Sequence, residues 1–276
     1  MTGLPTTIRA VLPLSTALPI EADDEDVGPD GPPHLALALG ELTAPWEVYR
    51  LLAGSRRLRK VPRADPRGAA VIDVPGWGAP EALTAPLRAY LRSLGYDARG
   101  WGFGLNRGDV RGDVQRLEKH LDATIDPASP VRLVGWSLGG VIVREVARRR
   151  PDLVRAVVTF GSPVVGGTAH TVGAHLEQVV GAGPAASERL AGYTERRDLH
   201  DPLDVPVTVI LSRRDGIVSW QSCIDRHSPH AEHVEVSSTH LGMVLDPDVW
   251  TSVARGLAVT SERASAGSGS APRRSA

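Results

Sequence analysis

Hydrophobic and polar positions follow two rhythms along the middle of the chain. Short continuous apolar runs predict buried strands, and apolar residues spaced three and four apart predict amphipathic helices. The expected strands cover residues 69–74, 96–101, 131–135, 154–160, 207–211 and 234–236. The expected helices cover residues 81–94, 109–125, 139–150 and 246–257. Strands alternating with helices of this length indicate an α/β fold, with a mostly parallel central sheet and helices on both faces.

The pattern outside this core predicts the domain organisation. Residues 1–34 are expected to be a poorly ordered extension, and leucines at helical intervals predict one or two helices within 35–60. Residues 163–205, after the strand that ends near Phe160, break the strand–helix rhythm. They are expected to form a small helical insertion, either a lid over the sheet edge or an ordinary long connection. The folded domain then covers residues 35–259. The Ser-, Gly-, Ala- and Arg-rich residues 260–276 are expected to be a disordered tail.

Composition narrows the classes of partner. The chain has 31 Lys and Arg residues against 32 Asp and Glu residues, so it lacks the basic excess that nucleic-acid binding requires. A single cysteine, Cys223, excludes an intramolecular disulfide and suits a reducing compartment. No apolar run approaches the roughly 18 residues of a membrane span, so we expect a cytoplasmic protein without a transmembrane segment. Export is the alternative, because residues 8–20 are mildly apolar, although Pro13 and Pro19 interrupt them.

One short motif points to nucleophilic chemistry. Residues 135–139 read Gly-Trp-Ser-Leu-Gly and match the pattern G-x-S-x-G, which is modest evidence without its structural context. Here the motif follows an expected strand and opens an expected helix. A serine at such a tight strand-to-helix turn adopts strained backbone angles that expose its hydroxyl group. Ser137 is therefore the candidate nucleophile.

A serine hydroxyl needs a base to remove its proton, and histidine is the usual choice. His240 lies after the last expected strand and before the last helix, which places it at the same sheet edge as Ser137. His230 and His233, before or within that strand, are the alternatives. The spacing of the histidines along the chain does not predict a metal site.

The base in turn needs a carboxylate to hold its tautomer. Asp215 directly follows the expected strand 207–211, and the chain order Ser, Asp, His is the order that this motif requires. Asp225 is the alternative acid.

Two backbone N–H groups are expected to bind the oxyanion of the reaction intermediate. Leu138 supplies one, because it follows the nucleophile and opens a helix. Trp77 supplies the other, from the loop after the first expected strand, where Gly76 allows a tight turn. An ordinary turn is the alternative interpretation of that loop.

Six segments are similar to the α/β-hydrolase superfamily and, within it, to bacterial lipases and esterases. They are Val74–Trp77, Gly100–Gly104, Gly135–Gly140, Phe160–Pro163, Asp215–Val218 and Ser238–His240. The resemblance covers residues 69 to about 257 and implies Ser137 as nucleophile, Asp215 as acid and His240 as base, without a cofactor. The sequence differs from many members of this superfamily at two positions. Pro75 stands where they carry a histidine that supports the oxyanion loop. Leu241 stands where some carry a second cysteine, so Cys223 is expected to be a free, buried thiol.

The expected activity is hydrolysis of carboxylic esters through an acyl-enzyme, on a small-molecule or lipid ester. Acyl transfer and cleavage of thioesters or amides are alternatives on the same triad, and a low-turnover binding protein is the alternative of another class. Five apolar side chains are expected to line the acyl site, with core packing as their other role. They are Trp77, Trp101, Phe103, Trp136 and Leu241. The sequence gives no oligomeric state.

Overall fold

The computed structural model describes residues 8–10, 58, 61, 70–164 and 202–258. Its strands are β1 (Ile8–Ala10), β2 (Ala70–Val74), β3 (Asp97–Gly100), β4 (Val131–Trp136), β5 (Val154–Phe160), β6 (Val207–Ser212) and β7 (Ala231–Val236). Its α-helices are α4 (Ala85–Ser93), α5 (Val110–Thr124), α6 (Leu138–Arg149) and α9 (Pro247–Ala258). Three short 3-10 helices are η2 (Glu81–Thr84), η4 (Trp220–Cys223) and η5 (Gly242–Leu245).

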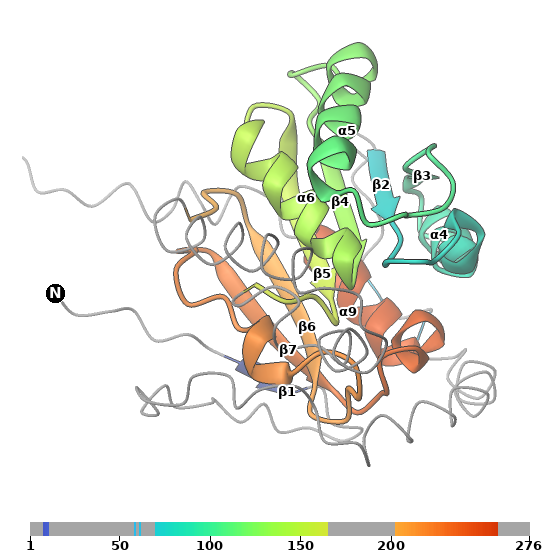
Figure 1. Ribbon diagram of the computed structural model, residues 1–276, viewed down its shortest axis with the longest axis vertical. Coiled ribbons are helices and arrows are strands. Elements are labelled where there is room, and N and C mark those ends of the chain that lie inside the picture. The colour runs from blue at the N-terminus through green and yellow to red at the C-terminus, as the bar shows by residue number, and fades with distance from the viewer. Residues whose placement is uncertain (1–7, 11–57, 59–60, 62–69, 165–201, 259–276) are drawn as a thin grey trace, which may run out of the picture.

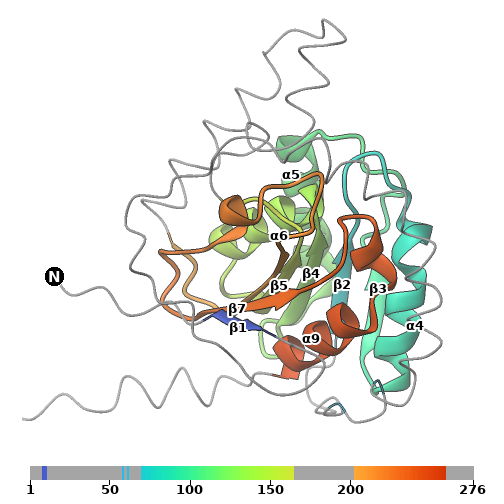
Figure 2. The same cartoon turned by 90° about the horizontal axis from the view of Figure 1, so that it is seen from below.

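The strands form one seven-stranded sheet in the order β1-β7-β6-β5-β4-β2-β3, and every described pairing is parallel (Figure 1). Helices α5 and α6 pack on one face of the sheet, whereas α4 and α9 pack on the other (Figure 2). The predicted parallel sheet with helices on both faces is therefore confirmed. Because all strands run the same way, their carboxyl ends meet at one edge, where ligand sites of such sheets lie.

The observed elements differ from the expected ones mainly at the β7 side of the sheet. Strand β7 begins at Ala231, three residues before the apolar run that predicted it, because its first half carries Glu232 and His233. Strand β1 lies within the segment expected to be an extension, and it pairs with β7 from Ile8 to Ala10. Three residues are too few to show a period in the sequence. The pairing covers backbone groups that would otherwise leave β7 an open edge.

The predicted N-terminal helices within 35–60 and most of the predicted insertion within 163–205 lie outside the described residues, as does the tail 260–276. These boundaries stay predictions. Among the helices that the structure describes, none combines the length and the apolar character needed to cross a membrane.

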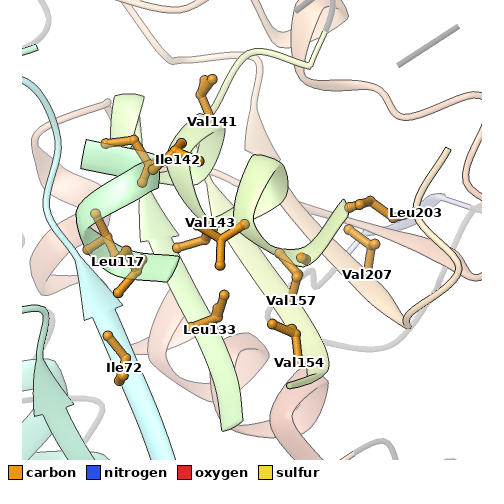
Figure 3. Close-up of a cluster of buried hydrophobic side chains, with 14 of the residues drawn as sticks. Ile72, Leu117, Leu133, Val141, Ile142, Val143, Val154, Val157, Leu203 and Val207 are labelled. Atoms are coloured by element: carbon orange, nitrogen blue, oxygen red, sulfur yellow. The ribbon is translucent and has the colours of Figure 1, made fainter. Parts of the chain in front are cut away.

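Helix α6 is largely buried, because the sheet covers one side of it and α5 covers another. Its Val143 side chain faces Leu133 of β4 and Val157 of β5, and its Ile142 side chain lies on the side of α5, near Leu117 (Figure 3). All five are fully buried. This apolar layer holds α6 against the sheet, next to the end of β4.

A buried polar network connects α6 with β7 through Asp225. Arg144 of α6 forms an ion pair with Asp225, with 2.9 Å between Nη2 and Oδ2. The backbone N–H of Asp225 donates to Nε2 of His233 in β7 at 2.9 Å. Burial lowers the pKa of His233 to about 4, since a charged imidazole would lose its hydration. The acceptor role of Nε2 likewise requires the neutral ring.

Replacing Ile142 with alanine should lower the free energy of unfolding by about 2–5 kcal/mol, because the cavity it leaves lies in a layer closed on both sides. Urea unfolding followed by circular dichroism measures this loss. Leu83→Ala is the matched control, since the Leu83 side chain is 42% exposed and its truncation should cost no more than about 0.5 kcal/mol. Equal losses in the two variants would contradict the described packing.

His233 should make stability depend on pH. Its folded pKa of about 4 lies below its unfolded value of about 6.5, so the stabilisation is complete above pH 6.5 and is lost as the pH falls toward 4. The loss should approach about 3 kcal/mol relative to His233→Gln, whose side-chain oxygen can still accept from the Asp225 N–H. Urea unfolding of both proteins at several pH values tests this. A wild-type-to-variant difference that stays constant with pH would show that His233 titrates normally.

Candidate active site

Ser137 occupies the sharp turn between β4 and α6. It is the one non-glycine residue with a positive φ among those the structure describes, at φ 53° and ψ −125°. Such a conformation persists only where neighbours enforce it. Here the Ser137 N–H donates to the carbonyl of Phe160 at 3.0 Å, and the Ser137 carbonyl accepts from Gly140 N–H at 2.9 Å. The turn leaves the serine partly exposed at the carboxyl edge of the sheet.

The two glycines of the motif allow this turn through close packing. A Cβ atom on Gly135 would lie 2.5 Å from the backbone of Gly140, and one on Gly139 would overlap the carbonyl oxygen of Val74. Strands β2 and β4 therefore approach the start of α6 more closely than any side chain permits. The spacing of the motif reflects this contact.

Asp215 and His240 lie together at the same edge. Asp215 follows β6 and His240 follows β7, and their Oδ2 and Nδ1 atoms are 2.7 Å apart with both side chains buried. The other carboxylate oxygen of Asp215 accepts from the backbone N–H groups of Ile217 at 2.8 Å and Val218 at 2.7 Å. The carboxylate is held at both oxygens, so Nδ1 of His240 carries the proton and donates it. In the neutral ring, Nε2 is then the nitrogen that can accept a hydrogen bond.

A glycine after β5 provides room for this pair. A Cβ atom on Gly161 would lie 3.0 Å from Nδ1 of His240 and 3.2 Å from Oδ2 of Asp215. On the other side, the ring of Trp136, the residue before Ser137, lies 5.5 Å from the imidazole ring. The ends of β4, β6 and β7 thus place the three expected site residues at one edge of the sheet.

The alternative site residues lie elsewhere. His233 and Asp225 belong to the buried network with Arg144. There Nε2 of His233 accepts a hydrogen bond from the backbone N–H of Asp225, and the Asp225 carboxylate pairs with Arg144. The backbone carbonyl of His230 accepts from Val207, the first residue of β6, which places His230 at the opposite edge of the sheet.

The loop after β2 passes beside Ser137. A Cβ atom on Gly76 would lie 3.1 Å from Cβ of Ser137. The Gly76 carbonyl accepts from Ala79 N–H at 3.1 Å, and in a trans peptide the next N–H, that of Trp77, points the opposite way. Within the described part of the chain, neither this N–H nor that of Leu138 has a hydrogen-bond partner.

The five aromatic and aliphatic residues expected to line an acyl site divide into two groups. Trp77 and Leu241 present large apolar surfaces, being 67% and 43% exposed. Trp101 is fully buried, where it packs edge-on against the half-buried Phe103. Trp136 is also buried and packs against the histidine. Trp101 thus packs in the core and cannot contact a substrate, because its side chain is fully buried and its ring N–H donates to the Gly104 carbonyl at 3.0 Å.

One further residue contacts this site without having been singled out from the sequence. Asn106 is completely buried, and its side-chain N–H donates to the carbonyl of Pro75 at 2.8 Å. It is the sole asparagine in the printed sequence, and it stands in the glycine-rich stretch between two expected elements. Those two signals could have marked it.

Cys223 is a free buried thiol, as expected, and burial raises its pKa, which keeps it protonated and unreactive. Across the described ranges, no group of three or more His, Cys, Asp or Glu side chains could hold a metal ion.

Comparison with curated proteins gives a short match. The chain is 32% identical over 100 residues to a pimeloyl-(acyl-carrier protein) methyl ester esterase of Shewanella woodyi. The match covers 35% of this chain and 37% of the esterase, so it spans little more than a third of that relative. No family model matches the chain.

Solved structures match over much longer stretches, at lower identity. A monoacylglycerol lipase of Paleococcus ferrophilus superposes with a TM-score of 0.52, at 18% identity, over 71% of this chain and 96% of the lipase. A type II thioesterase of the yersiniabactin pathway gives 0.53, at 15% identity, over 71% and 95%. An α/β-hydrolase enzyme from the sediment metagenome of the Mar Chica lagoon gives 0.50, at 19% identity, over 67% and 88%. Together with the sheet topology, these likenesses identify the chain as a protein of the α/β-hydrolase fold.

Proposed function

We propose that the protein is a serine hydrolase that cleaves carboxylic esters. Ser137 is the nucleophile, His240 the general base and Asp215 the acid that orients it. The observation that carries the proposal is the buried contact of 2.7 Å between Asp215 and His240, beside a serine held at positive φ. A strained serine and a histidine with a fixed tautomer together supply what nucleophilic attack needs.

The first half-reaction forms an acyl-enzyme. Nε2 of His240 takes the proton of the Ser137 hydroxyl while Oγ forms a bond to the ester carbonyl carbon. The carbonyl oxygen becomes an oxyanion, which the N–H groups of Trp77 and Leu138 bind. The bond from carbon to the alcohol oxygen then breaks, and the departing alcohol takes the proton from His240.

The second half-reaction restores the enzyme. A water molecule gives one proton to Nε2 of His240 as its oxygen bonds to the acyl carbon, and the same two N–H groups bind the new oxyanion. The bond between the acyl carbon and Oγ of Ser137 breaks, Ser137 regains a proton from His240, and a carboxylic acid leaves. Asp215 stabilises the imidazolium formed in each half-reaction without becoming protonated.

The exposed apolar surfaces of Trp77 and Leu241 favour an acyl chain or another apolar group as the part of the substrate next to the serine. A small-molecule or lipid ester fits this environment. The names of the similar proteins point the same way, since they include an ester-cleaving enzyme and a lipase.

Thioester cleavage is the second candidate. A thioester presents the same carbonyl carbon to Ser137, and one similar structure is a thioesterase. Acyl transfer differs from ester hydrolysis only in that another acceptor replaces water, and amide cleavage only in that an amine leaves in place of an alcohol. A protein that only binds ligands would have no use for the strain at Ser137 or for a buried Asp215–His240 pair.

Wild-type protein should form a single adduct with a fluorophosphonate, visible as one mass increment of the intact chain, and should hydrolyse p-nitrophenyl esters. Ser137→Ala should abolish the adduct and lower kcat by roughly 10⁴-fold or more. Asp215→Asn should lower kcat by roughly 10³- to 10⁴-fold, because His240 then loses the carboxylate that sets its tautomer.

Ser129→Ala, at an exposed serine between α5 and β4, is the matched control and should behave as wild type. Folded wild-type protein that forms no adduct and cleaves no ester would refute the proposal, and the binding-protein alternative would then be favoured.

A further inference from the structure

Asn106 lies buried in the loop between β3 and α5, with both ends of its side-chain amide engaged. Nδ2 donates to the carbonyl oxygen of Pro75 at 2.8 Å, and Oδ1 accepts from the backbone N–H of Gly108 at 3.0 Å. If the amide were rotated by 180°, its NH₂ group would face the Gly108 N–H and its oxygen would face the Pro75 carbonyl. Neither pair could form a hydrogen bond. The two contacts therefore fix the orientation of the side chain.

The backbone of Asn106 joins the same loop at a second place. Its carbonyl accepts from Gly78 N–H at 2.8 Å, and its N–H donates to the Ala79 carbonyl at 3.1 Å. The loop from Pro75 to Ala79 is thus held at its first residue by the Asn106 side chain and at its last two residues by the Asn106 main chain.

The side-chain contact acts where the loop has the most freedom. Gly76, without a Cβ atom, restrains its own backbone less than any other residue, and Pro75 offers no side-chain donor. The plane of the Pro75–Gly76 peptide is set by the hydrogen bond from Asn106. The next plane is set by Ala79 N–H on the Gly76 carbonyl, which directs the Trp77 N–H outward. Without the Asn106 side chain, the first plane loses its hydrogen bond and the second plane keeps only the one from Ala79 N–H.

We propose that Asn106 is a positioning residue whose side-chain amide, through the Pro75 carbonyl, aims the Trp77 N–H at the oxyanion. This inference rests on the proposed hydrolase function. Asn106 itself does not contact the substrate, so its effect should appear in the transition state and leave the binding of the ground state nearly unchanged.

The test compares Asn106→Ala with wild type on p-nitrophenyl butyrate. We expect kcat to fall by roughly 10- to 100-fold, less than the complete loss of one oxyanion donor, with KM changed by no more than roughly threefold. The affinity for a trifluoromethyl ketone, which forms a hemiketal oxyanion on the serine, should weaken by the same factor as kcat/KM. Ser228→Ala is the matched control. It removes another buried hydrogen bond, to Leu203 N–H, outside this loop, and should leave both quantities unchanged.

Asn106→Asp gives a second, independent readout. An introduced carboxyl group can donate to the Pro75 carbonyl only when it is protonated, and burial raises the pKa of such a group. The ratio of variant kcat to wild-type kcat should therefore rise as the pH falls from about 8 to about 5. The same ratio for Asn106→Ala should stay flat.

An Asn106→Ala variant that keeps kcat within roughly twofold of wild type would overturn the inference, and so would inhibitor affinity that does not follow kcat/KM. If that variant does not fold, the Asn106→Asp ratio decides, since a flat ratio overturns the inference and a rising one supports it. Failure here is distinct from failure of the proposed function, because the latter would already leave wild type without a fluorophosphonate adduct on Ser137.

Discussion

Helix α6 begins at the end of β4, and its first turn lies so close to the sheet that positions 135 and 139 have no room for a side chain. A Cβ atom on Gly135 or Gly139 would collide with backbone, so both positions must be glycine for the helix to start there. The chain can make the turn only if the intervening residue adopts a positive φ, and that residue is Ser137. The same contact seats the buried side chains of α6 on the sheet and the helix α5 on top of them. Exposure of the serine and packing of the core therefore follow from one close approach.

The sheet determines where the site residues lie, whereas hydrogen bonds of the loops determine how they point. Strand ends alone bring Asp215 and His240 to the edge at which Ser137 stands. Two backbone N–H groups then hold one oxygen of Asp215 and leave the other to the imidazole. A glycine at position 161 keeps the space between β5 and this pair clear.

Much of the fold could be predicted because apolar runs and helical periods are local properties of the sequence. Ser137, Asp215 and His240 could be nominated for a related reason, since each directly follows an expected strand. The roles of Asn106 and Gly161 could not be predicted, because their partners are distant in the chain and come close only through the folded sheet. His233 is an alternative base by its place in the sequence, which contains nothing that reveals its acceptor role toward Asp225. Strand β1 was missed because three residues carry no period.

The parallel arrangement of the strands has a consequence for how the molecule folds. No two paired strands in the described sheet are joined by a hairpin, so no strand pair can form from a short stretch of chain. Each pairing closes a loop that contains a helix or a long connection, and the entropy of closing it is lost before the pairing stabilises anything. The contact between positions 215 and 240 also joins the ends of two separate strands. The residues proposed for catalysis are thus expected to come together late in folding, so a partly folded chain would contain them without the geometry that the proposed reaction needs.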